Sequence, residues 1–339
     1  MKKIIPVLGL IFLCINSIRA QDLWSSGRPD GHSPISIMGD HYHHKGEVMF
    51  SYRFMPMSMK GVLQSSDEIE DDAVFANYMA SPQKMQMNMH MLGGMYAVSD
   101  HLTLMAMANY ISNEMDLNTK MGSNFTTESS GFGDISLSGL IKIVNANRQS
   151  VHGNLGISLP VGSISEKDIT PTMENAILAY PMQLGSGTFD PFFGFTYLGQ
   201  SDVLSWGFQP KYKFRIGEND ENYSLGNRFD AVAWGAVKVS KLLSLSTSLN
   251  YSNLGKIQGS DQRMNPMMMP LFNTENSGRS QLDIGFGSNI YIFSGSLKNL
   301  RFGAEVKLPV YQDVNGIQMK NKLTGVFGVQ YSFATHSKE

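Results

Sequence analysis

Methionine and histidine recur in this sequence at spacings that could support metal chemistry. Fifteen of the 23 methionines lie between Met38 and Met121, several of them on alternate positions. Thioether sulfur is a soft ligand that prefers Cu(I) or Ag(I), and imidazole also binds Cu(II) and Zn(II). The candidate ligands are His41, His43, His44, Met55, Met57, Met59, Met85, Met87, Met89, Met105 and Met107. The competing interpretation is that methionine is flexible apolar filler. No cofactor is required in either case, and on the metal interpretation Cu(I) or Ag(I) is a ligand or a transported substrate.

The alternate spacing of these methionines indicates β-strands, in which side chains point to opposite faces in turn. In the stretch that begins at Val48, apolar Val48 and Phe50 alternate with Met49, Ser51 and Arg53. Stretches of this kind recur to the end of the chain, and they number about twelve, within the range of outer-membrane barrels. The sequence therefore predicts an all-β fold, a closed antiparallel transmembrane β-barrel.

The connections between these strands alternate between short and long, which is typical of barrels with short periplasmic turns and long external loops. Short connections fall near 99–100, 145–150, 199–202, 240–241 and 294–299. Long ones fall near 60–84, 112–130, 162–181, 216–228, 253–279 and 311–321. With apolar residues facing lipid, the polar parity faces the lumen. The charged residues predicted to line it are Arg53, Lys211, Lys213, Arg215, Arg301, Glu305 and Lys307.

The N-terminus has the layout of a cleavable secretory signal, with Lys2 and Lys3 before an apolar run and Ala20 at its end. The only cysteine, Cys14, lies inside that run, so the mature chain has no disulfide and no cysteine metal site. After Ala20 no apolar run is long enough for a membrane-spanning helix. The net charge of −2, without blocks of Lys or Arg, argues against nucleic acid as a partner.

These features divide the chain into four parts. We predict a signal peptide at 1–20, a histidine-bearing segment at 21–45, the barrel at 46–333 and a short tail at 334–339. The protein is expected in the outer membrane of a Gram-negative bacterium, with membrane lipid and the barrel-assembly machinery as partners. About twelve strands enclose a lumen of intermediate width, which the long loops or the segment 21–45 could plug.

Several phrases resemble those of an outer-membrane barrel family labelled only as transporters, which is akin to the channel proteins of meta-pathway phenol degradation. They are IMGDHYHHKGEVMFSYRFMPMSMKG, FTTESSGFGDISLSGL, YPMQLGSGTFD, GENDENYSLG and LPVYQDVNG. The resemblance extends over nearly all of the mature chain. It implies an outer-membrane location and a transport role, and it supplies no substrate.

The sequence thus favours a channel for small solutes, linked to copper or another soft metal. Two alternatives stay open: a channel for hydrophobic or aromatic compounds, and a structural or adhesion barrel without transport. An enzyme is not expected, because Gly185-Ser186-Gly187 lacks the GxSxG pattern of serine hydrolases.

Overall fold

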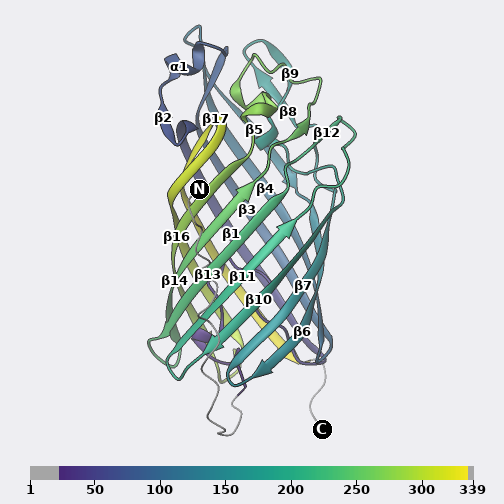
Figure 1. The fold of residues 1–339 in the computed structure, drawn as a ribbon, viewed down its shortest axis with the longest axis vertical. Coiled ribbons are helices and arrows are strands. Elements are labelled where there is room, and N and C mark those ends of the chain that lie inside the picture. The colour runs from purple at the N-terminus through teal and green to yellow at the C-terminus, as the bar shows by residue number, and fades with distance from the viewer. Residues whose placement is uncertain (1–22, 335–339) are drawn as a thin grey trace, which may run out of the picture.

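A computed structural model describes residues 23–334 and shows a closed antiparallel β-barrel (Figure 1). The predicted signal at 1–20 and residues 335–339 of the predicted tail lie outside the described residues. The elements of the wall are β1 Glu47–Ser65, β3 Ala80–Ser99, β4 Leu102–Thr119, β6 Ile135–Ala146, β7 Gln149–Leu159, β10 Asp190–Gln200, β11 Leu204–Lys213, β13 Arg228–Lys238, β14 Leu243–Leu254, β16 Arg279–Ile292 and β17 Leu300–Ala334.

Further short elements belong to the N-terminal segment and the loops. They are η1 Pro29–Gly31, β2 Asp67–Ile69, α1 Asp71–Phe75, β5 Asn124–Phe132, β8 Lys167–Thr170, β9 Met173–Ile177, η2 Tyr180–Met182, β12 Tyr223–Ser224, β15 Gln258–Gly259, η3 Pro270–Phe272 and η4 Thr274–Asn276. Among residues 23–334, no helix is long and apolar enough to cross a bilayer.

The sheet closes through β17, which pairs with β16 in its first half and with β1 in its second half. The chain reverses between these halves at Gly316, where φ is +61°. A left-handed backbone of this kind favours glycine, and an added Cβ would lie 1.9 Å from Asn276 Oδ1. The closed antiparallel barrel is as predicted, whereas the number of about twelve strands depends on dividing β17 at this reversal.

The two faces of the wall follow the parity of the sequence. On β1, Phe50 and Tyr52 are exposed at the outer surface, whereas Met49, Ser51 and Arg53 are buried toward the lumen. Exposed large apolar side chains recur on the wall strands, for example Leu104, Leu155, Phe193, Leu249 and Phe286. An apolar outer face of this kind suits a bilayer rather than water.

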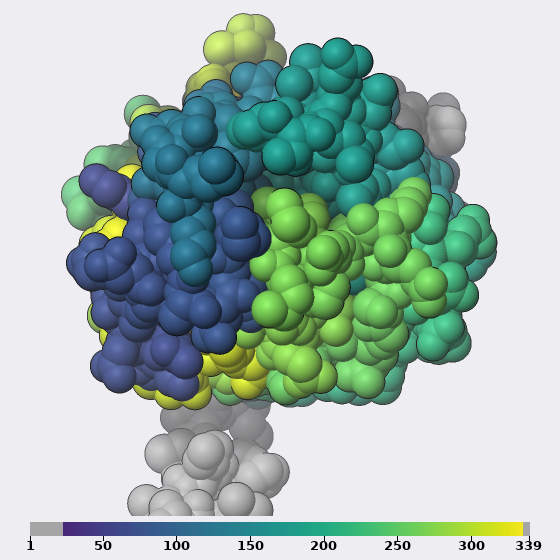
Figure 2. Space-filling view, turned by 90° about the horizontal axis from the view of Figure 1, so that it is seen from above, coloured from purple at the N-terminus to yellow at the C-terminus, as the bar shows by residue number. Residues whose placement is uncertain are grey.

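The two ends of the barrel differ in the way predicted from loop lengths. Short turns join β3 to β4, β6 to β7 and β13 to β14 at one end, which we call the short-turn end. The other end, the long-loop end, carries α1, β2, β8, β9 and β12 (Figure 1). Viewed from that end, the loops close over the barrel and leave no wide opening (Figure 2).

Candidate functional site: the barrel lumen

The segment before β1 lies inside the barrel near the short-turn end, and we call residues 24–43 the plug. Ile35 is 1% exposed, and the plug has no regular structure except η1, so its peptide groups need partners from the wall. Arg53 Nε donates to Ile35 O at 2.8 Å, and Gln209 Nε2 donates to Met38 O at 3.1 Å. The wall therefore buries this segment and supplies hydrogen-bond partners to its backbone.

The wall is also shaped to receive the plug. A Cβ added at Gly303 or Gly328 would lie 2.8 Å from a side-chain carbon of Ile35. A distance this short requires displacement, so glycine at both positions gives Ile35 room against the wall.

Three of the charged residues predicted to face the lumen lie against this plug. Arg301, 2% exposed, donates to Ser33 O at 2.5 Å and also to Asn289 and Gln330. Glu305, 1% exposed, accepts from Ser36 N at 3.2 Å. Together with Arg53, these side chains fasten the plug by charge-assisted hydrogen bonds, which are stronger than neutral ones.

The other predicted lumen charges lie above the plug. Lys211 Nζ and Lys213 Nζ lie over the ring of Phe192, at 4.5 and 6.0 Å from its centroid. Arg215 forms an ion pair with Asp190, whose side chain is fully buried. Lys307 is partly buried on β17. Lys211, Lys213 and Arg215 are thus paired with aromatic or acidic partners rather than left free in water.

The predicted histidine ligands divide into two environments. His41 is buried and meets Asp40 at 2.9 Å, and its ring centroid lies 4.9 Å from that of His43. Burial lowers the pKa of His43, although Glu47 opposes the shift. His44 instead lies at the surface, 3.5 Å from Asp100. The ligands predicted from the sequence did not include His32 and Asp40, which lie beside His41 in the structure.

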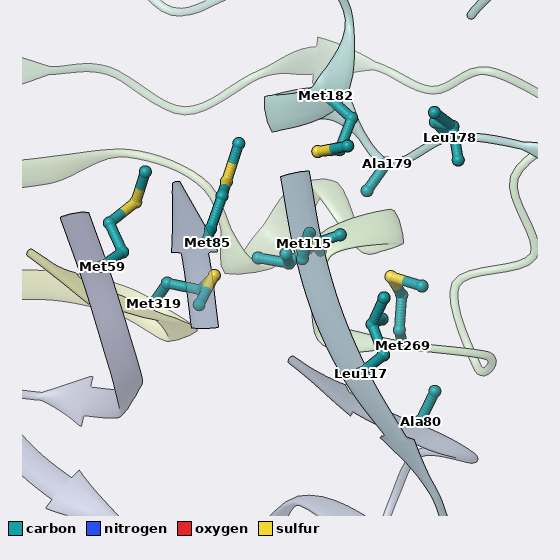
Figure 3. Close-up of a cluster of buried hydrophobic side chains, with 11 residues drawn as sticks. Met59, Ala80, Met85, Met115, Leu117, Leu178, Ala179, Met182, Met269 and Met319 are labelled. Carbon is teal, nitrogen blue, oxygen red and sulfur yellow. The ribbon is translucent and has the colours of Figure 1, made fainter. Parts of the chain in front are cut away.

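The predicted methionine ligands lie elsewhere in the barrel. Met55, Met57 and Met59 on β1 are paired with Met89, Met87 and Met85 on β3. Met59 and Met85 belong to a buried cluster with Leu117, Leu178, Ala179 and Leu271, against which Met57 and Met87 pack. The cluster also contains Met115, Met182, Met269 and Met319, and its side chains come from several separate elements (Figure 3).

The remaining predicted methionines line the lumen closer to the short-turn end. Met89 and Met107 line a cavity of about 300 Å³ together with Lys213 and Arg215. Met105 packs beside Tyr42 of the plug. The structure therefore does not bring the predicted methionines and histidines into one site.

An apolar cavity of about 330 Å³ lies among the loops at the long-loop end. Its lining includes Met115, Phe125, Ile177, Leu178, Met269 and Phe272. A second cavity, of about 360 Å³, includes Met59, Met85, Arg215, Arg228, Arg279 and Met319 in its lining. The segments around η2 and η3 contribute residues to both cavities and so separate them. We call these the outer and inner cavities.

Sequence reasoning did not find the outer cavity, because loops that are distant in sequence build it. Phe125 comes from β5, Ile177 from β9 and Phe272 from η3. No periodic pattern indicates how such loops fold over one another. The methionine-rich sequence was the available signal, since Met115 and Met269 line this cavity.

Comparison with known proteins gives a family and a fold. Residues 72–291 match the model of a family described as "Putative MetA-pathway of phenol degradation". No curated protein matches the sequence. An outer membrane channel from Pseudomonas putida F1 has a similar structure, with a TM-score of 0.59 and 12% identity over 87% of this chain and 98% of that one.

Two other solved structures are more distant. A FadL homologue from Pseudomonas aeruginosa has a TM-score of 0.42 and 9% identity, covering 93% of this chain and 99% of that one. The toluene transporter TodX of P. putida has a TM-score of 0.43 and 8% identity, covering 87% of this chain and 92% of that one. At these identities the likeness concerns the fold, and these two scores are too low to support an argument about function.

Proposed function

Because the family match covers more than half of the sequence, the chain belongs to the family described as a MetA pathway of phenol degradation, and we propose that it is an outer-membrane channel for small hydrophobic solutes, aromatic compounds among them. The observation that carries this proposal is the outer cavity. Its volume of about 330 Å³ falls within the range of small-molecule sites, which are mostly apolar.

The composition of the outer cavity suits aromatic solutes. Phe125 and Phe272 present rings, and Met115 and Met269 present polarizable sulfur, which makes favourable contacts at the edges of aromatic rings. Flexible methionines also adapt to solutes of different shape. Arg263, Asn265 and four threonines also line the outer cavity, but apolar side chains outnumber them, so the lining favours an apolar solute over a sugar or an ion.

The same observations support the hydrophobic alternative over copper transport. The methionines of the upper barrel pack against one another and against leucine and alanine, with no histidine or charged side chain in their buried cluster as the structure describes it. Such a cluster is what an apolar lining requires. The outer-membrane location rests on the apolar outer face of the wall and on the fold shared with the Pseudomonas putida channel.

Uptake of radiolabelled toluene at limiting concentration tests the proposal. Cells that express the barrel should take up toluene faster than cells with an empty vector. Phe125→Asp places a charge in the outer cavity and should lower the gain at least ~5-fold, because burying an unpaired charge costs ~1 kcal/mol or more. Ile216→Asp is the matched control, since Ile216 is 62% exposed and lies outside the cavity lining.

Both variants must reach the membrane as folded barrels, which heat-modifiable migration on gels reports. Equal toluene uptake with and without the wild-type barrel would contradict the proposal. So would an equal loss of uptake in the two variants.

A further inference from the structure

Three metal-ligating side chains of the plug converge inside the barrel. His32, Asp40 and His41 each offer one ligand atom, and these atoms all lie within 4.8 Å of one another. The three residues are 6%, 3% and 2% exposed. The rings of His32 and His41 meet edge to face with centroids 5.0 Å apart. We call this group the plug cluster.

The hydrogen bonds of the plug cluster are incomplete in a way that indicates a ligand. Both ring nitrogens of His32 are buried without a hydrogen-bond partner, and so is Nε2 of the neighbouring His43. Buried polar groups are almost always paired, and an unpaired one needs a reason such as a bound ion.

We propose that His32, Asp40 and His41 bind a divalent ion of the zinc class and that this ion fastens the plug. Two imidazoles and one carboxylate suit Zn²⁺, Cu²⁺ or Ni²⁺. They do not suit Ca²⁺ or Mg²⁺, which prefer oxygen ligands, or Cu(I), which prefers sulfur. His43 stands next to His41, with ring centroids 4.9 Å apart, but it is not one of the three residues whose ligand atoms lie together.

The charges around the plug cluster permit a cation. The positive charge of Arg301 disfavours a bound cation, but its guanidinium donates its hydrogen bonds to Ser33 O, Asn289 and Gln330. Asp40 is a ligand, and Glu305 lies nearby with its oxygens on Ser36 and Ser248. These two carboxylates offset the positive charges of Arg301 and Arg53.

The position of the ligands determines what the ion would do. His32 precedes the turn of chain that carries Ile35, and Asp40 and His41 follow it. An ion bound to all three would close residues 33–39 into a loop and hold Ile35 against Gly303 and Gly328. Metal binding of this kind stabilises the folded arrangement of its ligands.

Zn²⁺ titration of the purified full-length barrel, stripped with a chelator and then freed of it, tests the site. Competition with a chromophoric chelator should show one equivalent of Zn²⁺ per barrel. His32→Ala and Asp40→Asn should each weaken binding at least ~10-fold, the scale on which even supporting partners matter in metal sites. His44→Ala should bind as the wild type does, because His44 is at the surface beside Asp100.

Equal affinity of the wild-type barrel and the His32→Ala variant for Zn²⁺ would overturn the proposal. Asp40→Asn keeps the volume of the side chain, so it reports on the ligand even if His32→Ala folds poorly. The measurement follows metal binding and does not involve solute uptake, so its failure is distinct from a failure of the proposed channel function.

Discussion

Arg53→Met should loosen the plug, because Arg53 is the wall residue that binds the backbone beside Ile35. Its guanidinium donates to Ile35 O at 2.8 Å and to Ser51 Oγ at 3.3 Å, and the side chain is 4% exposed. Methionine keeps an unbranched stem of similar length next to Gly328, so the change removes the donors while much of the packing stays.

The magnitude follows from the carbonyl that loses its partner. A buried acceptor left unsatisfied costs ~1–3 kcal/mol, which shifts an equilibrium between closed and open plug roughly 5- to 150-fold. The barrel wall itself should stay intact, since β1 keeps its pairing with β3 and β17.

The rate at which a cysteine in the plug is labelled measures the shift between closed and open plug directly. The only cysteine of the sequence is Cys14, in the predicted signal, so Ser33→Cys introduces a single thiol into a position that is 1% exposed. Labelling by a bulky maleimide should require the plug to open and should speed up by the same 5- to ~150-fold factor when Arg53→Met is added. The control is Lys241→Met, in an exposed turn between β13 and β14.

An unchanged labelling rate in Arg53→Met would refute this reasoning. The same would follow if Lys241→Met accelerated labelling equally, because the effect would then be general loosening. Loss of heat-modifiable migration would instead report damage to the barrel, and Arg53→Lys, which keeps a charge but not the guanidinium geometry, then gives the second measurement.

Two further predictions concern packing. Gly328→Ala should also accelerate labelling at Ser33→Cys, because its Cβ would lie 2.8 Å from Ile35 Cγ1 and 3.0 Å from Arg53 Cγ; unchanged labelling would show that the wall yields there. The triple change Met57→Leu, Met87→Leu, Met107→Leu should alter stability by less than ~1.5 kcal/mol per site and leave toluene uptake unchanged; loss of uptake with a folded barrel would show that the sulfur atoms themselves are needed.

The barrel itself could be predicted because its main signals are local. Alternation along β1 separates Phe50 from Met49 and Ser51, and a one-residue error would turn every side chain to the wrong face. The alternation of short and long connections then predicted that one end of the barrel carries short turns and the other end long loops. The chain reversal at Gly316 lies within the connection predicted near 311–321, and the two halves of β17 pair with different strands on its two sides.

The plug cluster and the outer cavity could not be predicted in the same way. His32 lies nine positions before His41 in a segment without periodicity, so only the walls of the barrel bring the two rings together. The same holds for Phe125, Ile177 and Phe272, which come from three different loops. Side-chain type indicated the chemistry available, whereas tertiary packing decided which side chains meet.

The two ends of the lumen are closed by different interactions, and this difference bears on how a channel for apolar solutes would work. At the long-loop end, Met115, Leu178 and Met269 close the space between loops by apolar packing, and an apolar solute offers the same kind of contact in exchange. At the short-turn end, Arg53 and Arg301 hold the plug by hydrogen bonds that an apolar solute cannot replace. On the proposed function, a solute would therefore enter the outer cavity at little cost without loosening the plug. Its passage to the short-turn end would then depend on the strength of the hydrogen bonds between wall and plug, to which a bound metal ion would add.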